Sequence, residues 1–520
     1  MEKPFMTTTK LILSLFTIIF YVNESNAQVS KERLIVGNRF QSEIKLGSEY
    51  RYELPLGKGQ FALIDLEQKG VDVKISTCAP DGKVIEEFDS PNGAIGNEII
   101  LIDATESGLY TLEVTPLEEK AKKKKGKYSI ELIATNKTIN SHLDSSFELV
   151  ESSNYLPGFF VSIINNEKVL YTNGQGFANI KDQIPYTKNT IQQIESISKT
   201  FLGLAIMLLV EEGKLDLDGD INEYLPFKVR NPHFLETPIT LRQLATHTAA
   251  IDDREKQDNF AWIENKEIFD ENKAKYIHKK RRKYYQSLLN NTEITMKDFL
   301  KSFFVPNEKN YSKNNFLKNK PGEQWYYSNI GATLAAYIIE LVSKQPYSEF
   351  VEQRVISPLK LQHTTWGYGL GKDAIHALKY GGGKNEYPRI TSPTYPDGGI
   401  YSSTNDLSKY LMHWIKGYSG KKALLESSSY KELMNVQFEA TDGQFKGIKN
   451  GLFWWIFKEN RMGHNGGNMG SNANIFFYPE LGVGYTSLEN MSYGESEGAM
   501  LQSDRIKQIL NRYLKYFSNE

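Results

Sequence analysis

Residues 194–213, IESISKTFLGLAIMLLVEEG, decide the fold of the larger part of this chain. From Thr200 to Val210 the stretch is apolar nearly all round, which indicates a buried helix, and Gly213 follows where a helix end favours glycine. Ser196 and Lys199 stand at the head of this helix. Residues three apart share a helix face, so their side chains can meet.

The pair Ser196 and Lys199 is typical of nucleophilic catalysis. A serine hydroxyl is a poor nucleophile until a base takes its proton, and a lysine can be that base when burial or a neighbouring cation lowers its pKa. The positive end of the helix dipole would also act on Ser196. The pattern therefore predicts Ser196 as a nucleophile and Lys199 as its activating neighbour.

Two further elements carry polar groups suited to the same chemistry. Tyr327-Ser328-Asn329 precedes a predicted helix, where a phenol can relay protons and an amide can hold a lysine or a substrate carbonyl. Gly463-His464-Asn465-Gly466-Gly467 leads into a predicted hairpin, and its glycines would let a substrate approach the strand edge. Backbone N–H groups at such an edge can bind an oxyanion.

In this order the elements resemble those of the serine β-lactamase-related family, which includes class C β-lactamases, D-alanyl-D-alanine carboxypeptidases, D-aminopeptidases and esterases. The likeness runs from about Phe147 to the C-terminus. Five ordered blocks carry it: residues 194–226 (IESISKTFLGLAIMLLVEEGKLDLDGDINEYLP), 239–251 (ITLRQLATHTAAI), 321–340 (PGEQWYYSNIGATLAAYIIE), 396–411 (PDGGIYSSTNDLSKYL) and 463–479 (GHNGGNMGSNANIFFYP).

The resemblance implies a fold and a set of roles. The expected fold class is α+β, a mainly antiparallel sheet covered by helices plus a helical lobe, with the cleft between them. Ser196 would be acylated with Lys199 as its base partner, and Tyr327 would shuttle the proton and activate water. Asn329 would position Lys199 and substrate, His464 and Gly466 would line the substrate edge, and the N–H groups of Ser196 and Gly467 would form the oxyanion hole.

One departure from the family pattern bears on the substrate. Many β-lactamases have Lys-Thr-Gly where this chain has His464-Asn465-Gly466. A lysine is a permanent cation for a substrate carboxylate, whereas histidine is mostly neutral near pH 7. The change favours an esterase or a peptidase over a β-lactamase. In HTAAI the usual serine and glycine are replaced by alanines, and His247 is interpreted as structural.

Residues 1–146, which precede the stretch that resembles the β-lactamase-related family, have a different sequence pattern. Residues 1–27 combine Lys3 and Lys10 with a short apolar run and Ser25-Asn26-Ala27, which predicts a cleaved signal peptide and a periplasmic or secreted protein without a stable membrane anchor. Residues 28–135 show period-two alternation with turn residues between, which predicts a small antiparallel β-sandwich. Through residues 71–85 (VDVKISTCAPDGKVI) and 107–114 (SGLYTLEV) this segment resembles the bacterial pre-peptidase C-terminal domain. Polar residues 136–146 are expected to be a linker, and residues 147–520 the hydrolase domain.

Bulk properties narrow the remaining choices. Lys+Arg 62 against Asp+Glu 63 gives a formal net charge of -1, which argues against nucleic acid as a partner. Cys78 is the single cysteine and is expected to be a buried thiol. The sequence has neither an HExxH pattern nor a His/Cys cluster, so no metal is predicted, and nothing in it requires an organic cofactor.

The expected function is an exported serine hydrolase that forms an acyl-enzyme on esters or amides, with a small-molecule or peptide acyl substrate. Two alternatives stay open. One is a penicillin-binding-like ligand sensor that is acylated without turnover. The other is a binding protein that contacts a glycan or a protein through its β-sandwich.

Overall fold

A computed structural model describes residues 31–89, 93–117, 125–253, 260–266, 279–370, 373–441, 446–447 and 449–518. The predicted signal peptide, residues 1–27, lies outside the described residues. The chain divides into two compact units, residues 1–138 and residues 139–520.

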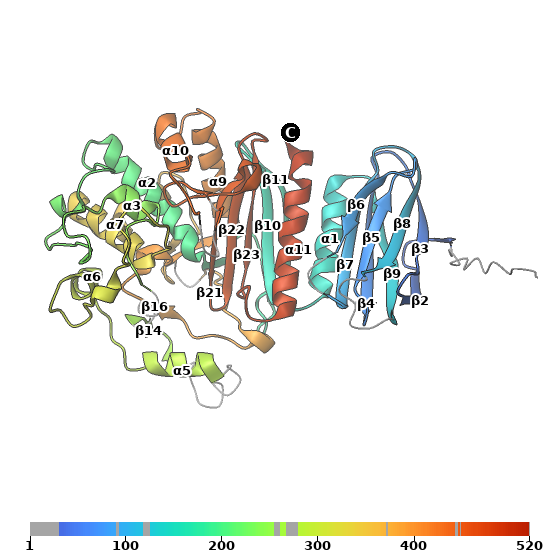
Figure 1. Cartoon of the computed structure of the whole chain (residues 1–520), viewed down its shortest axis with the longest axis horizontal. Helices are drawn as coiled ribbons and strands as arrows, with labels where there is room; N and C mark the ends of the chain where they lie inside the picture. Colours follow the sequence, from blue (N-terminus) through green and yellow to red (C-terminus); the bar gives the residue numbers. More distant parts are fainter. Residues whose placement is uncertain are drawn as a thin grey trace, which may run out of the picture. The chain divides into compact units, whose positions relative to one another are not determined.

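The first unit is a sandwich of two sheets (Figure 1). One sheet has the strand order β1-β3-β8-β5-β6 and the other β2-β9-β4-β7. All neighbours pair antiparallel except β1 and β3, which are parallel. The strands are β1 (Lys31–Arg33), β2 (Arg39–Lys45), β3 (Tyr50–Leu56), β4 (Phe61–Lys69), β5 (Val73–Cys78), β6 (Val84–Phe88), β7 (Ile95–Asp103), β8 (Gly108–Pro116) and β9 (Lys125–Asn136).

The predicted alternation explains the core of this sandwich. Strand β8 has Tyr110, Leu112 and Val114 buried and the residues between them at least partly exposed. Side chains on a strand alternate between faces, so each strand gives one apolar row to the space between the sheets. Cys78 is buried, and burial raises the pKa of its thiol. The prediction of a β-sandwich at this end of the chain is confirmed.

Helix α1 (Ile139–Ser152) occupies most of the segment predicted as a linker, and that prediction was wrong over residues 139–146. Its buried side chains are His142, Leu143, Ser146, Phe147 and Val150. These five residues follow helical spacing. Because two of them are polar and the stretch is rich in Ser and Asn, the sequence does not show a clear amphipathic pattern. His142 Nε2 is 2.7 Å from Tyr513 Oη, so its polar ring is partnered inside the second unit.

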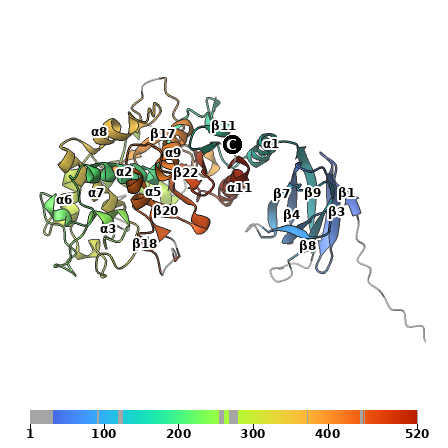
Figure 2. The same cartoon turned by 90° about the horizontal axis from the view of Figure 1, so that it is seen from above.

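The second unit is built on a nine-stranded antiparallel sheet in the order β12-β11-β10-β23-β22-β21-β20-β19-β18. Figure 1 shows α11 along one face of this sheet and α9 on the other, and Figure 2 gives the view from above. The strands are β10 (Gly158–Asn165), β11 (Val169–Asn179), β12 (Ile184–Pro185), β18 (Phe438–Glu439), β19 (Lys449–Asn450), β20 (Trp455–Ile456), β21 (Met462–Asn468), β22 (Ser471–Tyr478) and β23 (Val483–Glu489).

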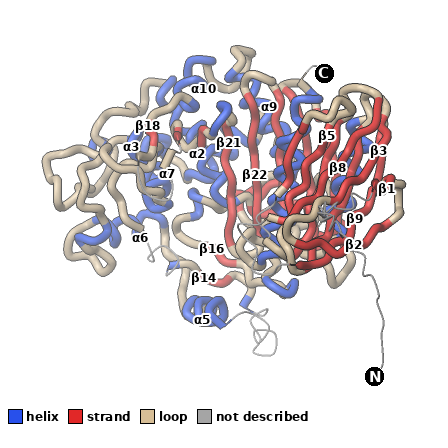
Figure 3. Tube along the Cα trace, turned by 45° about the vertical axis from the view of Figure 1, so that its right-hand side comes forward, coloured by secondary structure: helices blue, strands red, loops and turns tan. Residues whose placement is uncertain are grey.

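A helical lobe lies next to this sheet, on the side of strands β18 and β21 (Figure 3). It contains α2 (Ser198–Glu211), α3 (Leu241–Ala245), α6 (Met296–Phe304) and α7 (Asn329–Ser343). The other helices of the unit are α5 (Lys279–Leu288), α8 (Tyr347–Val351), α9 (Thr404–Tyr418), α10 (Ser427–Met434) and α11 (Glu497–Tyr513). Two small sheets, β13-β17-β15 and β14-β16, complete it: β13 (Ile191–Gln193), β14 (Trp262–Ile263), β15 (Thr365–Trp366), β16 (Ile390–Thr391) and β17 (Ile400–Ser403).

Helix α2 forms the centre of the apolar core of this unit. Its residues from Ser198 to Leu209 are all buried, as the apolar run predicted. Burial of an apolar side chain contributes about 1.5–3 kcal/mol. The helix is therefore held from every side, which fixes the residues at its N-terminus. The α+β fold class predicted for this part of the chain is confirmed.

Helix α11 begins earlier than the sequence suggested. The apolar stripe from Ile506 to Phe517 predicts a helix that begins at Ser503 or Asp504. In the structure Ser496 caps the helix, and its hydroxyl accepts a hydrogen bond from the N–H of Ala499. Ser503 is instead buried and donates to Glu489. Two polar residues that could have been caps are thus interior positions of the helix. Among the described residues, no helix is long and apolar enough to cross a membrane.

Candidate active site

Ser196 and Lys199 meet at the N-terminus of α2. Ser196 lies in the single turn Glu195–Ile197, and Lys199 follows in the first turn of α2. Lys199 Nζ lies 3.1 Å from Ser196 Oγ and donates to the backbone oxygen of Asp397 at 2.6 Å. Lys199 is fully buried and makes no ion pair with a described carboxylate. The amine is thus held between two neutral oxygens, one of them the candidate nucleophile.

The backbone just before Ser196 has an unusual conformation. Glu195 has φ +51°, in the left-handed region that favours glycine. Its buried carboxylate accepts from Ser471 Oγ and lies 3.2 Å from Lys379 Nζ, which also donates to Gln193. Both side chains are more than nine-tenths buried. A buried ion pair therefore fixes the residue next to the candidate nucleophile.

Tyr327 lies on the loop that enters α7, and two buried groups hold this loop. Asp253 Oδ2 accepts from the backbone N–H groups of Asn329 at 2.6 Å and Ile330 at 2.9 Å. His247 Nδ1 accepts the N–H of Ser328 at 3.2 Å. Burial raises the pKa of Asp253 and lowers that of His247. The structural role expected for His247 therefore has a specific form: it anchors the loop that carries Tyr327.

The Tyr327 ring is packed among aromatic groups beside the lysine. Its centroid lies 5.0 Å from Lys199 Nζ, 4.3 Å from the His247 ring and 6.0 Å from Trp455, with which it stacks. Stacked and tilted contacts of this kind restrict the ring to one orientation. The phenol is thus fixed near the Ser196–Lys199 pair while Tyr327 itself is only half-buried.

Strand β21 brings the glycine-rich element against the candidate nucleophile. A Cβ at Gly466 would lie 2.1 Å from the backbone oxygen of Ile194 and 3.0 Å from the backbone nitrogen of Ser196. Only glycine permits so close an approach. Gly467 follows Gly466 on the same strand. The oxyanion hole expected from the N–H groups of Ser196 and Gly467 stays a prediction.

His464, on the same strand, is neutral. Its Nδ1 lies 2.6 Å from the backbone oxygen of Asn465, which identifies Nδ1–H as the donor. Burial and then the charge of Lys199 lower the pKa of His464 to about 3. The ring packs on Trp455 at 5.6 Å. Unlike the lysine in many β-lactamases, it offers no positive charge to a substrate carboxylate.

The neutrality of His464 predicts a pH effect on stability. The folded pKa of about 3 is below the ordinary 6.5, so unfolding between these values takes up a proton. The stability contributed by neutral His464 is fully present above pH 6.5 and is lost as the pH falls towards 3. Between pH 3 and 6.5 the free energy of unfolding should decrease less steeply with falling pH in His464→Gln than in the wild type. We expect the two slopes to differ by up to about 1.4 kcal/mol per pH unit.

Urea unfolding followed by tryptophan fluorescence at several pH values measures this slope. All six tryptophans lie in residues 139–520, so the signal reports this unit alone. Equal slopes for the variant and the wild type would contradict a neutral buried His464.

The structure brings together Ser196, Lys199, Tyr327 and His464 and sets Gly466 and Gly467 beside them. Asn329, expected to position Lys199, begins α7 and gives its backbone N–H to Asp253. Ala250, where the family pattern has glycine, takes φ +56°, so the turn keeps the conformation expected of glycine. Sequence reasoning did not assign Asp253, Lys379 or Asp397 to the site, although Asp397 lies within the quoted block 396–411.

Comparison with known proteins decides the family. The profile of the Beta-lactamase family matches residues 147–505, more than half of the chain. The chain belongs to the β-lactamase family. A relative is the protein flp of Staphylococcus aureus strain MRSA252, 23% identical over 359 residues, which are 67% of this chain and 62% of that protein. The human mitochondrial serine beta-lactamase-like protein LACTB is 26% identical over 301 residues, 50% of this chain and 54% of that protein.

Solved structures of the β-lactamase family share the fold. The octameric penicillin-binding protein homologue from Pyrococcus abyssi has a TM-score of 0.56 and 25% identity, over 71% of this chain and 77% of its own. A class C β-lactamase has a TM-score of 0.52 and 19% identity, over 72% and 96%. The chain spans less than two thirds of the length of the two relatives from Staphylococcus aureus and human.

Proposed function

We propose that this protein hydrolyses esters or amides through an acyl-enzyme formed on Ser196. The observation that carries the proposal is the 3.1 Å contact between Ser196 Oγ and a fully buried Lys199, with Tyr327 fixed beside it. Membership of the β-lactamase family supports the same chemistry. A buried amine bound to neutral oxygens is suited to take the serine proton.

The proposed acylation uses groups that already face one another. As Ser196 Oγ attacks the carbonyl carbon, its proton passes to Lys199 and on to the leaving group, with Tyr327 as the relay. The negative charge on the carbonyl oxygen is stabilised by the N–H groups of Ser196 and Gly467. The bond to the leaving group then breaks, and an ester to Ser196 remains.

Deacylation reverses the proton path. Tyr327 and Lys199 take a proton from water, the resulting hydroxide attacks the acyl carbon, and Ser196 Oγ leaves with the proton. The products are the free acid and the regenerated serine. Every proton in this sequence is carried by the chain's own residues, the substrate or water.

The test is to incubate the protein with p-nitrophenyl acetate, nitrocefin and a D-alanyl peptide while following turnover and intact mass. Turnover, or an adduct mapped to Ser196, supports the proposal. An adduct that forms without turnover would indicate the ligand-sensor alternative instead. Neither turnover nor adduct with any of the three donors would contradict acyl transfer on Ser196.

Neutral His464 also predicts the preferred donor. We expect the p-nitrophenyl ester of a simple alkanoic acid to be hydrolysed with a kcat/KM at least about tenfold above that of a matched hemiester with a terminal carboxylate. His464 stands where many β-lactamases have a lysine, and with a pKa of about 3 it offers no positive charge to pair with such a carboxylate. Equal rates for the two esters would show that a carboxylate is accepted.

Export is proposed on the sequence pattern of residues 1–27 alone. N-terminal sequencing of the protein recovered from expressing bacteria should start near Gln28, in the periplasmic or medium fraction. A retained Met1 in the cytoplasm would contradict export. Binding of a glycan or a protein by the β-sandwich stays an alternative, which a binding assay with residues 28–135 would address.

A further inference from the structure

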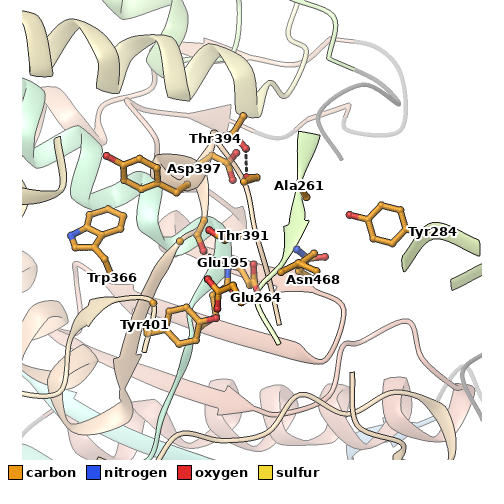
Figure 4. Close-up of a pocket in the computed structure, with 17 residues that line it drawn as sticks. Glu195, Ala261, Glu264, Tyr284, Trp366, Thr391, Thr394, Asp397, Tyr401 and Asn468 are labelled. Atoms are coloured by element: carbon orange, nitrogen blue, oxygen red, sulfur yellow. Dashed lines mark hydrogen bonds between the residues drawn. The ribbon is translucent and has the colours of Figure 1, made fainter. Parts of the chain in front are cut away.

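A cavity of about 290 Å³ opens next to the proposed acyl-transfer site (Figure 4). Glu195, which precedes Ser196, and Asn468, which follows Gly467 on β21, both line it. The cavity therefore adjoins the sequence neighbours of both proposed oxyanion-hole nitrogens. A substituent on the acyl carbon would lie close to its mouth.

The charged groups of the cavity wall are all acidic. Among the described residues, its lining includes three carboxylates, those of Glu195, Glu264 and Asp397, and neither a lysine nor an arginine. Glu195 is already paired with Lys379, and Glu264 is exposed. The guanidinium of Arg389 is held 4.1 Å from the Tyr368 ring, and neither residue belongs to the lining.

Of the two buried carboxylates of this wall, Glu195 and Asp397, Asp397 is the one that forms no ion pair among the described residues. It is 9% exposed, and its Oδ2 is buried with no hydrogen-bond partner in the described part of the chain. A buried polar atom left without a partner costs about 1–3 kcal/mol. Burial raises the pKa of Asp397 to about 7, although the charge of Lys199 and a hydrogen bond from Thr394 to the carboxylate act in the opposite direction. A donor supplied by a ligand would satisfy this oxygen.

The rest of the wall suits a cation. Aromatic rings of Trp366, Tyr395, Tyr401 and Tyr284 line it, and the face of an aromatic ring attracts an ammonium or guanidinium group. Figure 4 shows Trp366 and Tyr401 on the left of the view and Asp397 next to Thr394 above them. A carboxylate and aromatic faces around one cavity form an environment in which a cation is better accommodated than a neutral group or an anion.

We propose that this cavity binds a primary ammonium group on the acyl part of the substrate, with Asp397 as its counter-ion. This inference rests on the proposed acyl-transfer function and narrows its substrates to donors that carry a basic amine. Asp397 thus has two distinct roles, since its backbone oxygen holds Lys199 while its carboxylate faces the substrate.

The test compares two p-nitrophenyl esters, one of an ω-aminoalkanoic acid and one of the alkanoic acid in which a methyl group replaces the ammonium. We expect wild type to prefer the ammonium ester by at least about tenfold in kcat/KM. Asp397→Asn should abolish most of this preference, and the ratio of the two esters is the readout because it cancels any effect on Lys199. Glu480→Gln, which removes an exposed carboxylate from the turn after β22, is the matched control and should keep the preference.

Binding measured without catalysis separates the two proposals. Calorimetry of Ser196→Ala with benzylamine and with benzyl alcohol compares a cation with its neutral analogue, and benzylamine should bind at least about tenfold more tightly. Asp397→Asn in the same background should remove the difference. Equal binding of the two ligands, or a preference that survives Asp397→Asn, overturns the cation site. If the wild type binds benzylamine in preference to benzyl alcohol but hydrolyses neither ester, only the acyl-transfer proposal is contradicted.

Discussion

Replacing Ser196 by alanine should lower kcat/KM for ester hydrolysis by about 10⁴-fold or more, because the acyl acceptor is lost while binding is kept. Ser196 Oγ is the hydroxyl that Lys199 Nζ contacts, at 3.1 Å, so its removal leaves the amine with nothing to activate. Alanine fits the same backbone, since the residue is held by its neighbours in the turn Glu195–Ile197. The fold should therefore be unaffected.

Three measurements on wild type and variant check this expectation: kcat/KM on a p-nitrophenyl ester, intact mass after a short incubation, and urea unfolding by tryptophan fluorescence. The variant should show no acyl adduct and an unchanged unfolding midpoint. Ser419→Ala, at an exposed position after α9, is the matched serine control and should behave as wild type. Hydrolysis by Ser196→Ala within about tenfold of wild type would mean that another nucleophile is used.

The parts of the site that sequence reasoning reached are those fixed by local geometry. Ser196 and Lys199 are three residues apart at the head of an apolar helix, so helical periodicity alone predicts that they meet. The glycine at 466 could likewise be anticipated, because a backbone that must approach another backbone leaves no room for a side chain. Such features depend on a few neighbouring residues and are visible in a short window.

The parts that were missed depend on contacts between distant segments. Asp253 holds a loop 76 residues away, and Lys379 pairs with a glutamate 184 residues away. No pattern around either residue distinguishes it from a surface charge. The unpartnered carboxylate oxygen of Asp397 is visible only once the cavity that it lines has been assembled.

The prediction of secondary structure was wrong at two points for a related reason. Helix α1 was predicted as a linker because His142 and Ser146 are buried polar residues, and their partners Tyr513 and the backbone of His142 are not apparent from the local pattern. The start of α11 was placed too late because Ser503 resembled a cap, although it is buried beside Glu489. In both cases hydrogen bonds of the folded chain decided the role of a polar residue.

Among the ion pairs described in this unit, removing one partner of the buried pair of Glu195 and Lys379 should lower the free energy of unfolding most. Lys379→Met leaves the Glu195 carboxylate buried without its counter-ion, and loss of one partner of a buried pair typically costs about 3–5 kcal/mol. We expect the free energy of unfolding to fall by that amount, measured by urea titration with tryptophan fluorescence. Activity should fall as well, since Glu195 sets the backbone next to Ser196.

A double variant decides the origin of this cost. Glu195→Gly with Lys379→Met removes both charges and places glycine at a position with φ +51°, where it is unstrained. Because the penalty of the single variant comes from an uncompensated charge, the double variant should regain most of the lost stability, although Ser471 and Gln193 lose a partner. If the double variant is no more stable than Lys379→Met, the lysine stabilises the fold through packing of its aliphatic stem. The unpaired charge of Glu195 would then not be the cause of the lost stability.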